Sequence, residues 1–408
     1  MGLGDLRDLP YPWDTLAEVT ATASAHPSGL IDLSIGTPVD PTPQVIQDAL
    51  AAASDAPRYP MTYGTPLLRQ TVAAWFARRR GVPDVNPAGV MPTIGSKELV
   101  GLLPSLLRLG PGDLVVHPAI AYPTYDVGAR AAGATPLPTD SIDEWAGRSN
   151  VRLVWVNSPS NPTGAVASVD YLRAVVQAAR EIGAIVVSDE CYAELPWTDA
   201  TSAADGGGVG DAALGESKSV PSLLDPAVTG GDHTGLLVAY SLSKQSNLAG
   251  YRAAFIAGDP AIVGDLVATR KHLGMIVPWP VQAAMRAALD DDTHVAAQRD
   301  IYGRRRAVLL DGLTAAGWTV DHSQAGLYLW ARPADSTHGG QGADGAGRPE
   351  SRALAARLAQ LGILVGPGEF YGQAGRHHVR IALTASDDHI AAAARRLRDS
   401  AVPDSAMP

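Results

Sequence analysis

Residues 236–252 read LLVAYSLSKQSNLAGYR, and this run carries the clearest structural pattern in the chain. Five apolar residues are followed by small polar ones, which is typical of a strand that is buried on both faces and ends at a ligand-binding edge. Similar apolar runs rich in Val and Ile recur from residue 87 onward, each followed by a turn and an amphipathic stretch. Their alternation predicts repeated βαβ units.

The apolar runs predict the strands of the main sheet at residues 89–94, 114–117, 134–137, 151–156, 185–188, 236–241 and 253–257. The amphipathic stretches between them predict helices at residues 97–108, 122–132, 169–182, 261–273 and 280–290. Continuous apolar strands belong to sheets that are covered on both faces. We therefore expect an α/β fold with a mainly parallel seven-stranded sheet sandwiched by helices.

The last part of the chain has a different pattern and predicts a smaller α+β domain. It contains a long helix, three antiparallel strands and two further helices, at residues 293–316, 318–321, 326–332, 379–382, 351–361 and 387–397. We expect the large domain to cover residues 45–285 and the small domain to combine residues 1–44 with 286–408. Two Gly-rich polar stretches, 201–233 and 336–348, are interpreted as surface insertions because they contain little apolar surface to bury.

The composition excludes several classes of protein. With 46% hydrophobic and 18% charged residues, the chain of 408 residues can bury a large core. Its formal charge of −10 disfavours nucleic acid and anionic membranes as partners, and we interpret the arginine clusters at 78–80 and 304–306 as solvated helix faces. No apolar run approaches the roughly 20 residues of a membrane span, and no signal sequence is recognisable. The single cysteine, Cys191, excludes a disulfide framework and a Cys-rich metal site, so we expect a cytoplasmic protein without a metal centre.

Lys244 is the most informative of only four lysines, because it follows the apolar strand at 236–241. At the carboxyl end of a strand, desolvation and neighbouring cations can lower the pKa of a lysine and make its amine a nucleophile. The alternative is an ordinary lysine in a βα loop. Arg252 lies eight residues further on, and with Ser241 and Ser243 it can bind a phosphate group.

Polar residues also follow other predicted strands. Gly95-Ser96-Lys97 opens a helix, where free backbone N–H groups attract anions. Asp189 follows a buried strand and needs a cationic or N–H partner, such as a protonated pyridine nitrogen; the alternative is a helix N-cap. Asn161 lies in a similar position, where the alternative is an Asn-Pro turn.

The strand ends carry NSPSNPTG at 157–164, SDECY at 188–192 and SLSK at 241–244, followed by Arg252. In this combination and order the chain resembles a fold-type I, class I/II aminotransferase dependent on pyridoxal 5′-phosphate. The resemblance covers the chain from Leu33 to Ala382. Two features depart from the family pattern: the Gly-rich stretch between Asp189 and Lys244, and the segment 326–330, which has Leu where many relatives have Phe.

The resemblance implies a role for each matching residue. Lys244 would bind the cofactor covalently and move a proton, Asp189 would pair with the ring nitrogen, and Asn161 and Tyr192 would donate to the phenolic oxygen. Tyr122 would cover the ring face, although it can also be a core aromatic at a helix start. The phosphate would be bound by Ser96, Lys97, Ser241, Ser243 and Arg252, with Tyr59 contributed by the other subunit of a homodimer. The substrate α-carboxylate would be bound by Gly36, Asn161 and Arg380.

The runs 93–100 and 241–252 look most like actinobacterial succinyldiaminopimelate aminotransferase of lysine biosynthesis. The expected reaction moves an amino group between glutamate and N-succinyl-2-amino-6-oxopimelate. Alternatives are an aspartate, alanine or aromatic amino acid aminotransferase, or a lyase, decarboxylase or racemase that uses the same fold and cofactor. The fold also serves as a sensor module in DNA-binding regulators, but these need a basic helix-turn-helix segment, and only about 30 residues precede Leu33.

Overall fold

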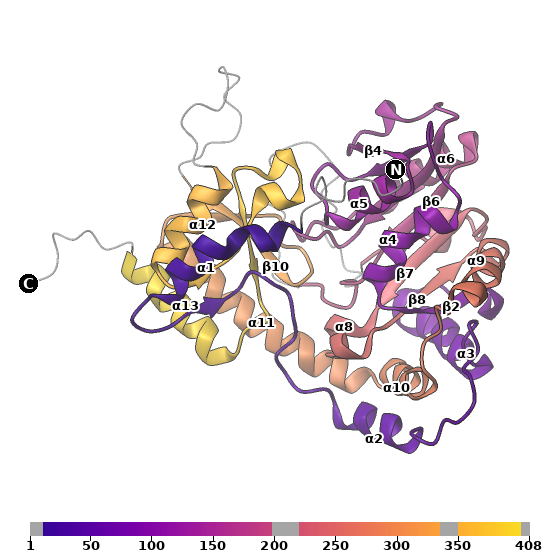
Figure 1. Ribbon diagram of the computed structural model, residues 1–408, viewed down its shortest axis with the longest axis horizontal. Helices are drawn as coiled ribbons and strands as arrows, with labels where there is room; N and C mark the ends of the chain where they lie inside the picture. The colour runs from indigo at the N-terminus through magenta and orange to yellow at the C-terminus, as the bar shows by residue number, and fades with distance from the viewer. Residues whose placement is uncertain (1–10, 198–219, 335–349, 401–408) are drawn as a thin grey trace, which may run out of the picture. The chain divides into compact units, whose positions relative to one another are not determined.

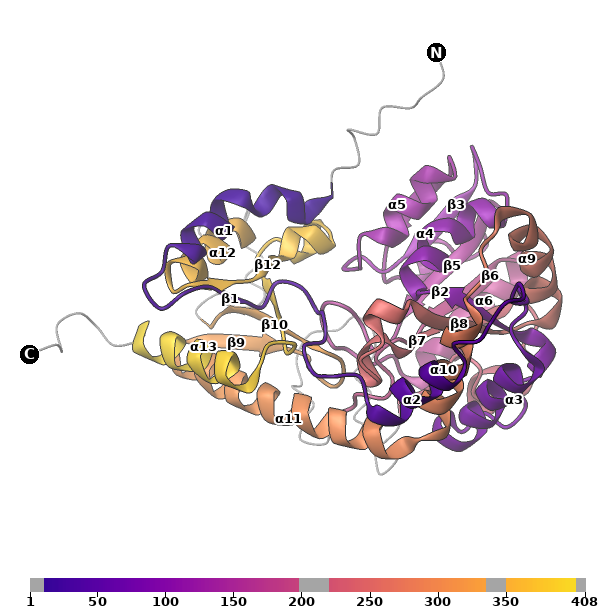
Figure 2. The ribbon, with the colours of Figure 1, turned by 60° about the horizontal axis from the view of Figure 1, so that its bottom comes forward.

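The computed structural model describes residues 11–197, 220–334 and 350–400 (Figures 1 and 2), and these residues form two compact units. The large unit comprises the described residues within 40–300 and the three residues Gln324–Gly326. The small unit comprises the described residues within 1–39, 301–323 and 327–408. The sequence predicts the boundary between the two domains at residue 285, a position that lies inside helix α10 (Trp279–Asp290). In the structure the large unit extends to residue 300, inside helix α11 (Asp292–Ala315).

The large unit is built on a seven-stranded sheet in the order β2-β8-β7-β6-β5-β3-β4. Its strands are β2 (Val90–Ile94), β3 (Leu114–His117), β4 (Thr135–Pro138), β5 (Val151–Asn157), β6 (Ile185–Asp189), β7 (Leu236–Ser241) and β8 (Ala253–Gly258). Strand β8 is antiparallel to both of its neighbours, and the other pairings are parallel. The predicted sheet is therefore confirmed, and each predicted strand agrees to within one residue.

Helices cover both faces of this sheet, as Figure 2 shows. One face packs on α4 (Ser96–Leu106), α5 (Thr124–Ala131) and α9 (Pro260–Leu273). The other packs on α3 (Pro66–Trp75), α6 (Val169–Ile182) and α10. Side chains alternate between the two faces, so Val238 of β7 belongs to one core cluster while Leu237 and Ala239 belong to the other. The predicted sandwich of helices is confirmed.

The small unit contains a four-stranded antiparallel sheet in the order β12-β13-β10-β9. These strands are β9 (Trp318–Asp321), β10 (Tyr328–Pro333), β12 (Gly366–Pro367) and β13 (Val379–Ala382). A separate parallel pair joins β1 (Ile31–Asp32) to β11 (Ile363–Leu364). The helices of this unit include α1 (Ala17–Ser24), α12 (Ser351–Gln360) and α13 (Asp387–Ser400).

The segment Gln324–Gly326 is hydrogen-bonded within the large unit, although small-unit residues flank it in the sequence. The side-chain oxygen of Gln324 accepts the Val166 N–H at 2.9 Å. The backbone N–H groups of Ala325 and Gly326 donate to the carbonyls of Gly164 and Leu195 at 3.0 and 2.9 Å. The chain therefore returns to the large unit for three residues between two small-unit strands.

The interpretation of residues 201–233 as a surface insertion is wrong for its last part. Val220, Leu223 and Leu224 are buried in the main core, and α7 (Pro226–Thr229) follows them. Three apolar residues within this polar stretch were sufficient to anchor it. The remainder, 201–219, and all of 336–348 lie outside the described residues, as does Lys218.

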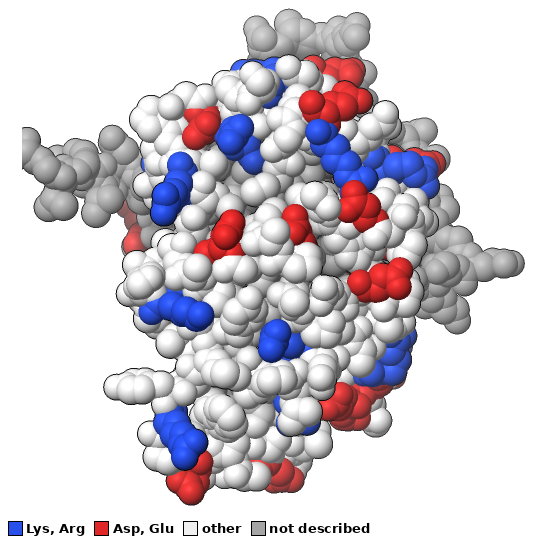
Figure 3. All heavy atoms as spheres, turned by 90° about the vertical axis from the view of Figure 1, so that its right-hand side faces the viewer, with Lys and Arg blue, Asp and Glu red and all other residues white. Residues whose placement is uncertain are grey.

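The arginine clusters are not simply solvated helix faces. Arg80 ends the π-helical turn Phe76–Arg80, is only 4% exposed and forms an ion pair with buried Glu190 at 2.9 Å. Arg305 and Arg306 are also buried. The interpretation fails for these three arginines, since each is buried and bonded to a polar partner: Arg305 donates to Asp387 at 2.6 Å and Arg306 to the Ser323 hydroxyl at 3.0 Å. On the face drawn in Figure 3, acidic and basic side chains lie singly or in small groups among wide uncharged areas. No helix in the described ranges is long and apolar enough to cross a membrane.

Candidate active site

Polar residues gather at the carboxyl ends of β5, β6 and β7, which are neighbours in the large sheet. Asn157 ends β5, Asp189 ends β6 and Ser241 ends β7. Asn157 is paired in register with Asp189, and Asp189 with Ala239, two residues before Ser241. Parallel strands bring their carboxyl ends to one edge of the sheet, where ligands bind in α/β folds.

Asp189 is a buried carboxylate held by neutral donors. It is 8% exposed, and it accepts the Tyr125 hydroxyl at Oδ2 (2.9 Å) and the Cys191 N–H at Oδ1 (3.2 Å). Burial raises its pKa, although the hydrogen bonds from Cys191 and Tyr125 oppose this effect. No helix begins at Asp189, so the N-cap alternative does not apply. Among the described residues, no cation forms an ion pair with this carboxylate.

Lys244 follows β7 in the short helix α8 (Leu242–Gln245). The Ser241 side chain caps this helix: its oxygen accepts the Ser243 N–H at 3.2 Å, and its hydroxyl lies 2.9 Å from that of Ser243. Lys244 is half-buried, whereas Lys97 and Lys271 are exposed. Lys244 is therefore the most enclosed of the lysines that the structure describes.

Gly95 and Arg252 lie against each other and form a cradle at the start of α4. Gly95 has φ +75°, and a Cβ atom there would lie 2.0 Å from Nη2 of Arg252. Arg252 donates from Nη1 to the carbonyl of Ala249 at 2.8 Å, and its own carbonyl accepts the Gly95 N–H at 2.9 Å. The guanidinium thus lies beside the first turn of α4, which begins with Ser96 and Lys97 and whose first N–H groups lack intrahelical partners.

Asn157 connects two parts of the site. Its side-chain oxygen accepts the Asn161 N–H at 2.8 Å, and its side-chain nitrogen donates to the carbonyl of Asp189 at 3.1 Å. Asn161 and Tyr192 are both buried. Tyr122 is half-buried just before α5, and the ammonium of Lys97 lies 5.7 Å from its ring centroid.

These residues fit pyridoxal 5′-phosphate in three respects. The cradle of Gly95 and Arg252 suits a phosphate, and the amine of Lys244 suits an aldehyde. The buried carboxylate of Asp189, which otherwise has only neutral donors, suits a protonated ring nitrogen.

In the small unit the structure brings Gly36 and Arg380 to the same tyrosine. Arg380 of β13 is 2% exposed, its guanidinium carbon lies 4.0 Å from the ring centroid of Tyr328, and Nη2 donates to the carbonyl of Ser34 at 2.6 Å. A Cβ atom on Gly36 would lie 2.1 Å from the Tyr328 hydroxyl, so a larger residue at this position would have to displace the tyrosine ring. The rings of Tyr371 and Trp13 lie 4.9 and 5.7 Å from the same guanidinium carbon.

Tyr59 lies between α2 (Gln44–Ala52) and α3 and is 96% exposed. Within one chain it is therefore not enclosed with the other residues predicted for the site. The exposed apolar residues Met61 and Leu67 lie close to it in sequence.

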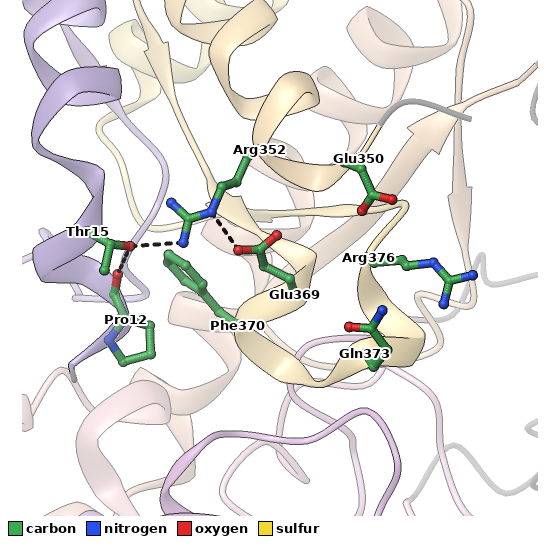
Figure 4. Close-up of a pocket in the computed structure, with 8 residues that line it drawn as sticks. All are labelled: Pro12, Thr15, Glu350, Arg352, Glu369, Phe370, Gln373 and Arg376. Carbon is green, nitrogen blue, oxygen red and sulfur yellow. Dashed lines mark hydrogen bonds and ion pairs between the residues drawn. The ribbon is translucent and has the colours of Figure 1, made fainter. Parts of the chain in front are cut away.

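The small unit also contains a pocket of about 480 Å³ (Figure 4). It is lined by Pro12, Thr15, Glu350, Arg352, Glu369, Phe370, Gln373 and Arg376. Arg352 donates to Glu369 at 2.6 Å and to the Thr15 hydroxyl at 3.2 Å. None of the residues predicted for the active site lines this pocket.

The sequence reasoning missed Tyr125, Asn157 and Tyr328 as contacts of site residues. Tyr125 lies three positions after Tyr122, which is close to one helical turn, and that spacing could have drawn attention to it. Asn157 ends a predicted strand in the same way as Asp189 does. Nothing in the local pattern around Tyr328 distinguishes it from a core aromatic.

The chain was compared with known proteins. The profile of the class I and II aminotransferase family matches residues 28–397. The chain is 54% identical over 387 residues to a probable aminotransferase of Mycobacterium tuberculosis, covering 95% of this chain and 84% of that protein. It is 52% identical over 393 residues to the 4-dedimethylamino-4-oxo-anhydrotetracycline transaminase of Streptomyces rimosus, covering 96% and 100%. An LL-diaminopimelate aminotransferase of Gloeobacter violaceus is 31% identical over 410 residues and covers 96% of each chain.

The comparison with solved structures also finds aminotransferases. An aminotransferase from Neisseria meningitidis superposes with a TM-score of 0.80 at 29% identity, covering 97% of this chain and 98% of that one. These names do not include the succinylated substrate that the sequence favoured, so the comparisons support the reaction type and leave the acceptor to be tested. Since the family profile and the relatives span nearly the whole chain, the protein belongs to the class I and II aminotransferases, which depend on pyridoxal 5′-phosphate.

Proposed function

We propose that this aminotransferase transfers the amino group of glutamate to N-succinyl-2-amino-6-oxopimelate, in the diaminopimelate branch of lysine biosynthesis. The proposal for the acceptor rests on the sequence resemblance at 93–100 and 241–252. The relatives named as LL-diaminopimelate aminotransferases act on a related diamino acid, which supports an acceptor of this class.

The observation that carries the catalytic proposal is the placement of buried Asp189 and half-buried Lys244 after neighbouring strands. Pyridoxal phosphate, when bound, supplies an electron sink for the pair that is released when the substrate Cα–H bond breaks. Lys244 binds the cofactor through its amine and, once free, takes and returns the Cα proton. Asp189 holds a proton on the ring nitrogen, and Asn161 and Tyr192 donate to the phenolic oxygen.

The other predicted residues bind and orient the cofactor and the substrate. Arg252, Ser241, Ser243 and the N-terminal turn of α4 at Ser96 and Lys97 bind the phosphate, and Tyr122 covers one face of the ring. As the family resemblance implies, the substrate α-carboxylate would be bound by Arg380 and Gly36, with Asn161 as a further donor. The planar guanidinium of Arg380 can make two parallel hydrogen bonds to that carboxylate.

Reduction with borohydride tests the cofactor assignment. The purified protein should be yellow, and borohydride should link the cofactor irreversibly to the peptide that contains Lys244. The variant Lys244→Ala should lose this adduct, while Lys271→Ala, which removes an exposed lysine, should retain it. An adduct on the same peptide in Lys244→Ala would show that another group is the nucleophile.

A half-reaction with glutamate tests the reaction class. It should convert the bound cofactor to its amine form and release one equivalent of 2-oxoglutarate. Ammonia or CO2 as the product would instead indicate a lyase or a decarboxylase.

A competition between acceptors tests the substrate. N-succinyl-2-amino-6-oxopimelate, an aromatic 2-oxo acid, oxaloacetate, pyruvate and the 4-oxo tetracycline compound should be compared by relative kcat/KM. The succinylated acceptor should be preferred. A tenfold preference for another acceptor, about 1.4 kcal/mol in transition-state binding, would overturn the pathway assignment and leave the transaminase activity standing.

A further inference from the structure

Tyr125 joins helix α5 to the end of β6 through a single hydrogen bond, from its hydroxyl to Oδ2 of Asp189 at 2.9 Å. The two residues are 64 positions apart in sequence. The tyrosine is 1% exposed, and its ring lies 5.1 Å from that of Trp155 and 6.5 Å from that of Tyr122. Such close packing leaves the ring little freedom, so the position of the hydroxyl oxygen is fixed by the fold.

We infer that Tyr125 is a positioning residue that fixes the orientation of the Asp189 carboxylate toward the ring nitrogen of the cofactor and favours its ionised form. The inference rests on the proposed role of Asp189. It assigns a function in the reaction to a tyrosine that otherwise belongs to the hydrophobic core.

The hydrogen bond matters because the carboxylate has few other sources of stabilisation. Its remaining contacts are the N–H and thiol of Cys191, which are also neutral donors. Burial raises the pKa of Asp189, and a protonated carboxyl group cannot stabilise a positive ring nitrogen. Burial also holds the pKa of Tyr125 well above its usual range, so its hydroxyl remains protonated and can donate near neutral pH.

The groups that face this pair are few and can be named. After burial, which has the largest effect, Asp189, Cys191 and Tyr122 also raise the pKa of Tyr125. The ring of His117 stacks on the Tyr125 ring, with the two centroids 6.5 Å apart. Burial raises the pKa of Cys191, while a hydrogen bond with Ser96 and the positive charge of Lys244 act to lower it. Tyr125 is thus the one side-chain hydroxyl that the described structure places on the Asp189 carboxylate.

The test compares wild-type holoenzyme with Tyr125→Phe, which keeps the ring and removes the donor. Loss of one hydrogen bond to a charged group should raise the dissociation constant of pyridoxal phosphate about tenfold or more. Because the pKa of Asp189 rises without its donor, the acidic limb of the pH profile of kcat/KM should move to higher pH. The pH dependence of the cofactor absorbance should shift in the same direction.

Tyr240→Phe is the matched control. Tyr240 is fully buried in β7 and its hydroxyl donates to Gln245, so the variant also removes a buried hydroxyl but does not alter Asp189. It should retain the wild-type pH profile. Equal shifts in both variants, or an unchanged profile in Tyr125→Phe, would overturn the inference.

A double-mutant cycle separates this inference from the proposed function and from a folding defect. If Tyr125 acts through Asp189, Tyr125→Phe should weaken cofactor binding much less in an Asp189→Asn background than in the wild type. Additive losses would show that Tyr125 acts independently. Failure of the wild-type protein to bind pyridoxal phosphate at Lys244 would instead refute the proposed function itself.

Discussion

At the scale of single residues, Gly95 is the position where one added carbon has the most direct consequence. In Gly95→Ala the new methyl group would come 2.0 Å from Nη2 of Arg252, and the residue would have to keep φ +75°. We expect the variant to displace the guanidinium, weaken binding of pyridoxal phosphate about tenfold, and lower the free energy of unfolding by about 1–2 kcal/mol from the backbone strain. Spectroscopic titration of the cofactor and thermal unfolding measure the two effects.

Gly147→Ala separates the collision from the strain. Gly147 has φ +74° and no atom within 4 Å of the position of a Cβ, so its variant has the same backbone cost without a collision. It should lose stability but not cofactor affinity. If both variants bind the cofactor equally well, the contact between Gly95 and Arg252 is not important for binding.

The sequence identifies individual site residues where a polar side chain follows an apolar strand. Lys244 and Asp189 could be selected in this way because a charged group at a buried strand end is costly without a partner. Tyr125 could be noticed from its spacing to Tyr122, but its hydrogen bond to Asp189 could not be inferred, because a tyrosine on the apolar face of a helix has the same sequence pattern whether or not its hydroxyl is hydrogen-bonded. Arg80 was misjudged for the opposite reason: three consecutive arginines suggest solvent, and the buried acid Glu190 that pairs with the last of them is distant in sequence.

At the scale of elements, the ion pair between Arg80 and Glu190 joins the turn after α3 to the segment after β6. Glu190 is fully buried and also accepts the Ser222 hydroxyl at 3.1 Å and the Leu223 N–H at 2.8 Å. Arg80→Met should lower the free energy of unfolding by about 3–5 kcal/mol, because it leaves a buried charge without its partner. Chemical denaturation measures this change.

Two further variants test the explanation. Adding Glu190→Gln to Arg80→Met should recover part of the lost stability, because the uncompensated charge is then removed. Arg173→Met breaks an exposed pair with Asp170 and should change the stability by less than about 1 kcal/mol. A loss in Arg80→Met no larger than that in Arg173→Met would contradict the argument.

Asp321 of β9 makes the small sheet sensitive to acid. Burial acts to raise its pKa, but hydrogen bonds from His378 and Arg332, both at 2.8 Å, outweigh burial and hold the pKa well below its usual range. A carboxylate whose pKa is lower in the folded state stabilises the fold above its unfolded pKa of about 3.9 and loses this contribution as the pH falls toward the folded value. Asp321→Asn should therefore lower the free energy of unfolding by about 2 kcal/mol at pH 7 and by progressively less below about pH 4.

Urea denaturation of the wild type and of Asp321→Asn at both pH values measures this difference. Asp170→Asn, at an exposed position, is the control and should differ little from the wild type at either pH. A stability difference for Asp321→Asn that does not shrink in acid would show that its cost is not electrostatic.

Element prediction succeeded where the hydrophobic pattern was long and failed where it was short. The strands of the large sheet have four to seven residues and most of them are mainly apolar, which local sequence can show. Strands β1, β11 and β12 have two residues each, too few for any period, and their pairing depends on distant segments. Helices α2 and α3 were not predicted from the sequence: α2 buries only Ile46, whereas α3 buries Leu68, Val72 and Trp75 and could have been recognised.

At the scale of the whole molecule, the exposure of Tyr59 is the main support for the proposed homodimer. Because 96% of its surface is exposed, Tyr59 is hardly buried by its own chain. Leu273 and Trp279 of the same unit are also exposed. If Tyr59 reaches the phosphate of a partner subunit, Tyr59→Phe should weaken cofactor binding several-fold to tenfold while changing the melting temperature little.

Sedimentation of the holoenzyme should show a dimer, and Tyr171→Phe, which removes the hydroxyl of a tyrosine that is not predicted to bind the cofactor, should bind the cofactor normally. A fully active monomer would refute the shared site. Equal cofactor loss in both tyrosine variants would refute the role of Tyr59 alone.

The return of Gln324–Gly326 to the large unit has a consequence for how the protein is made. A ribosome completes residue 300, the end of the main part of that unit, before it has added the three residues that bond to Val166, Gly164 and Leu195. Domains generally fold as units during synthesis, yet this one lacks part of its hydrogen bonding until residue 326 has emerged. A fragment ending at residue 300 would be an unfinished unit, and a hybrid that exchanges the small unit with a relative would have to carry these three residues across with it.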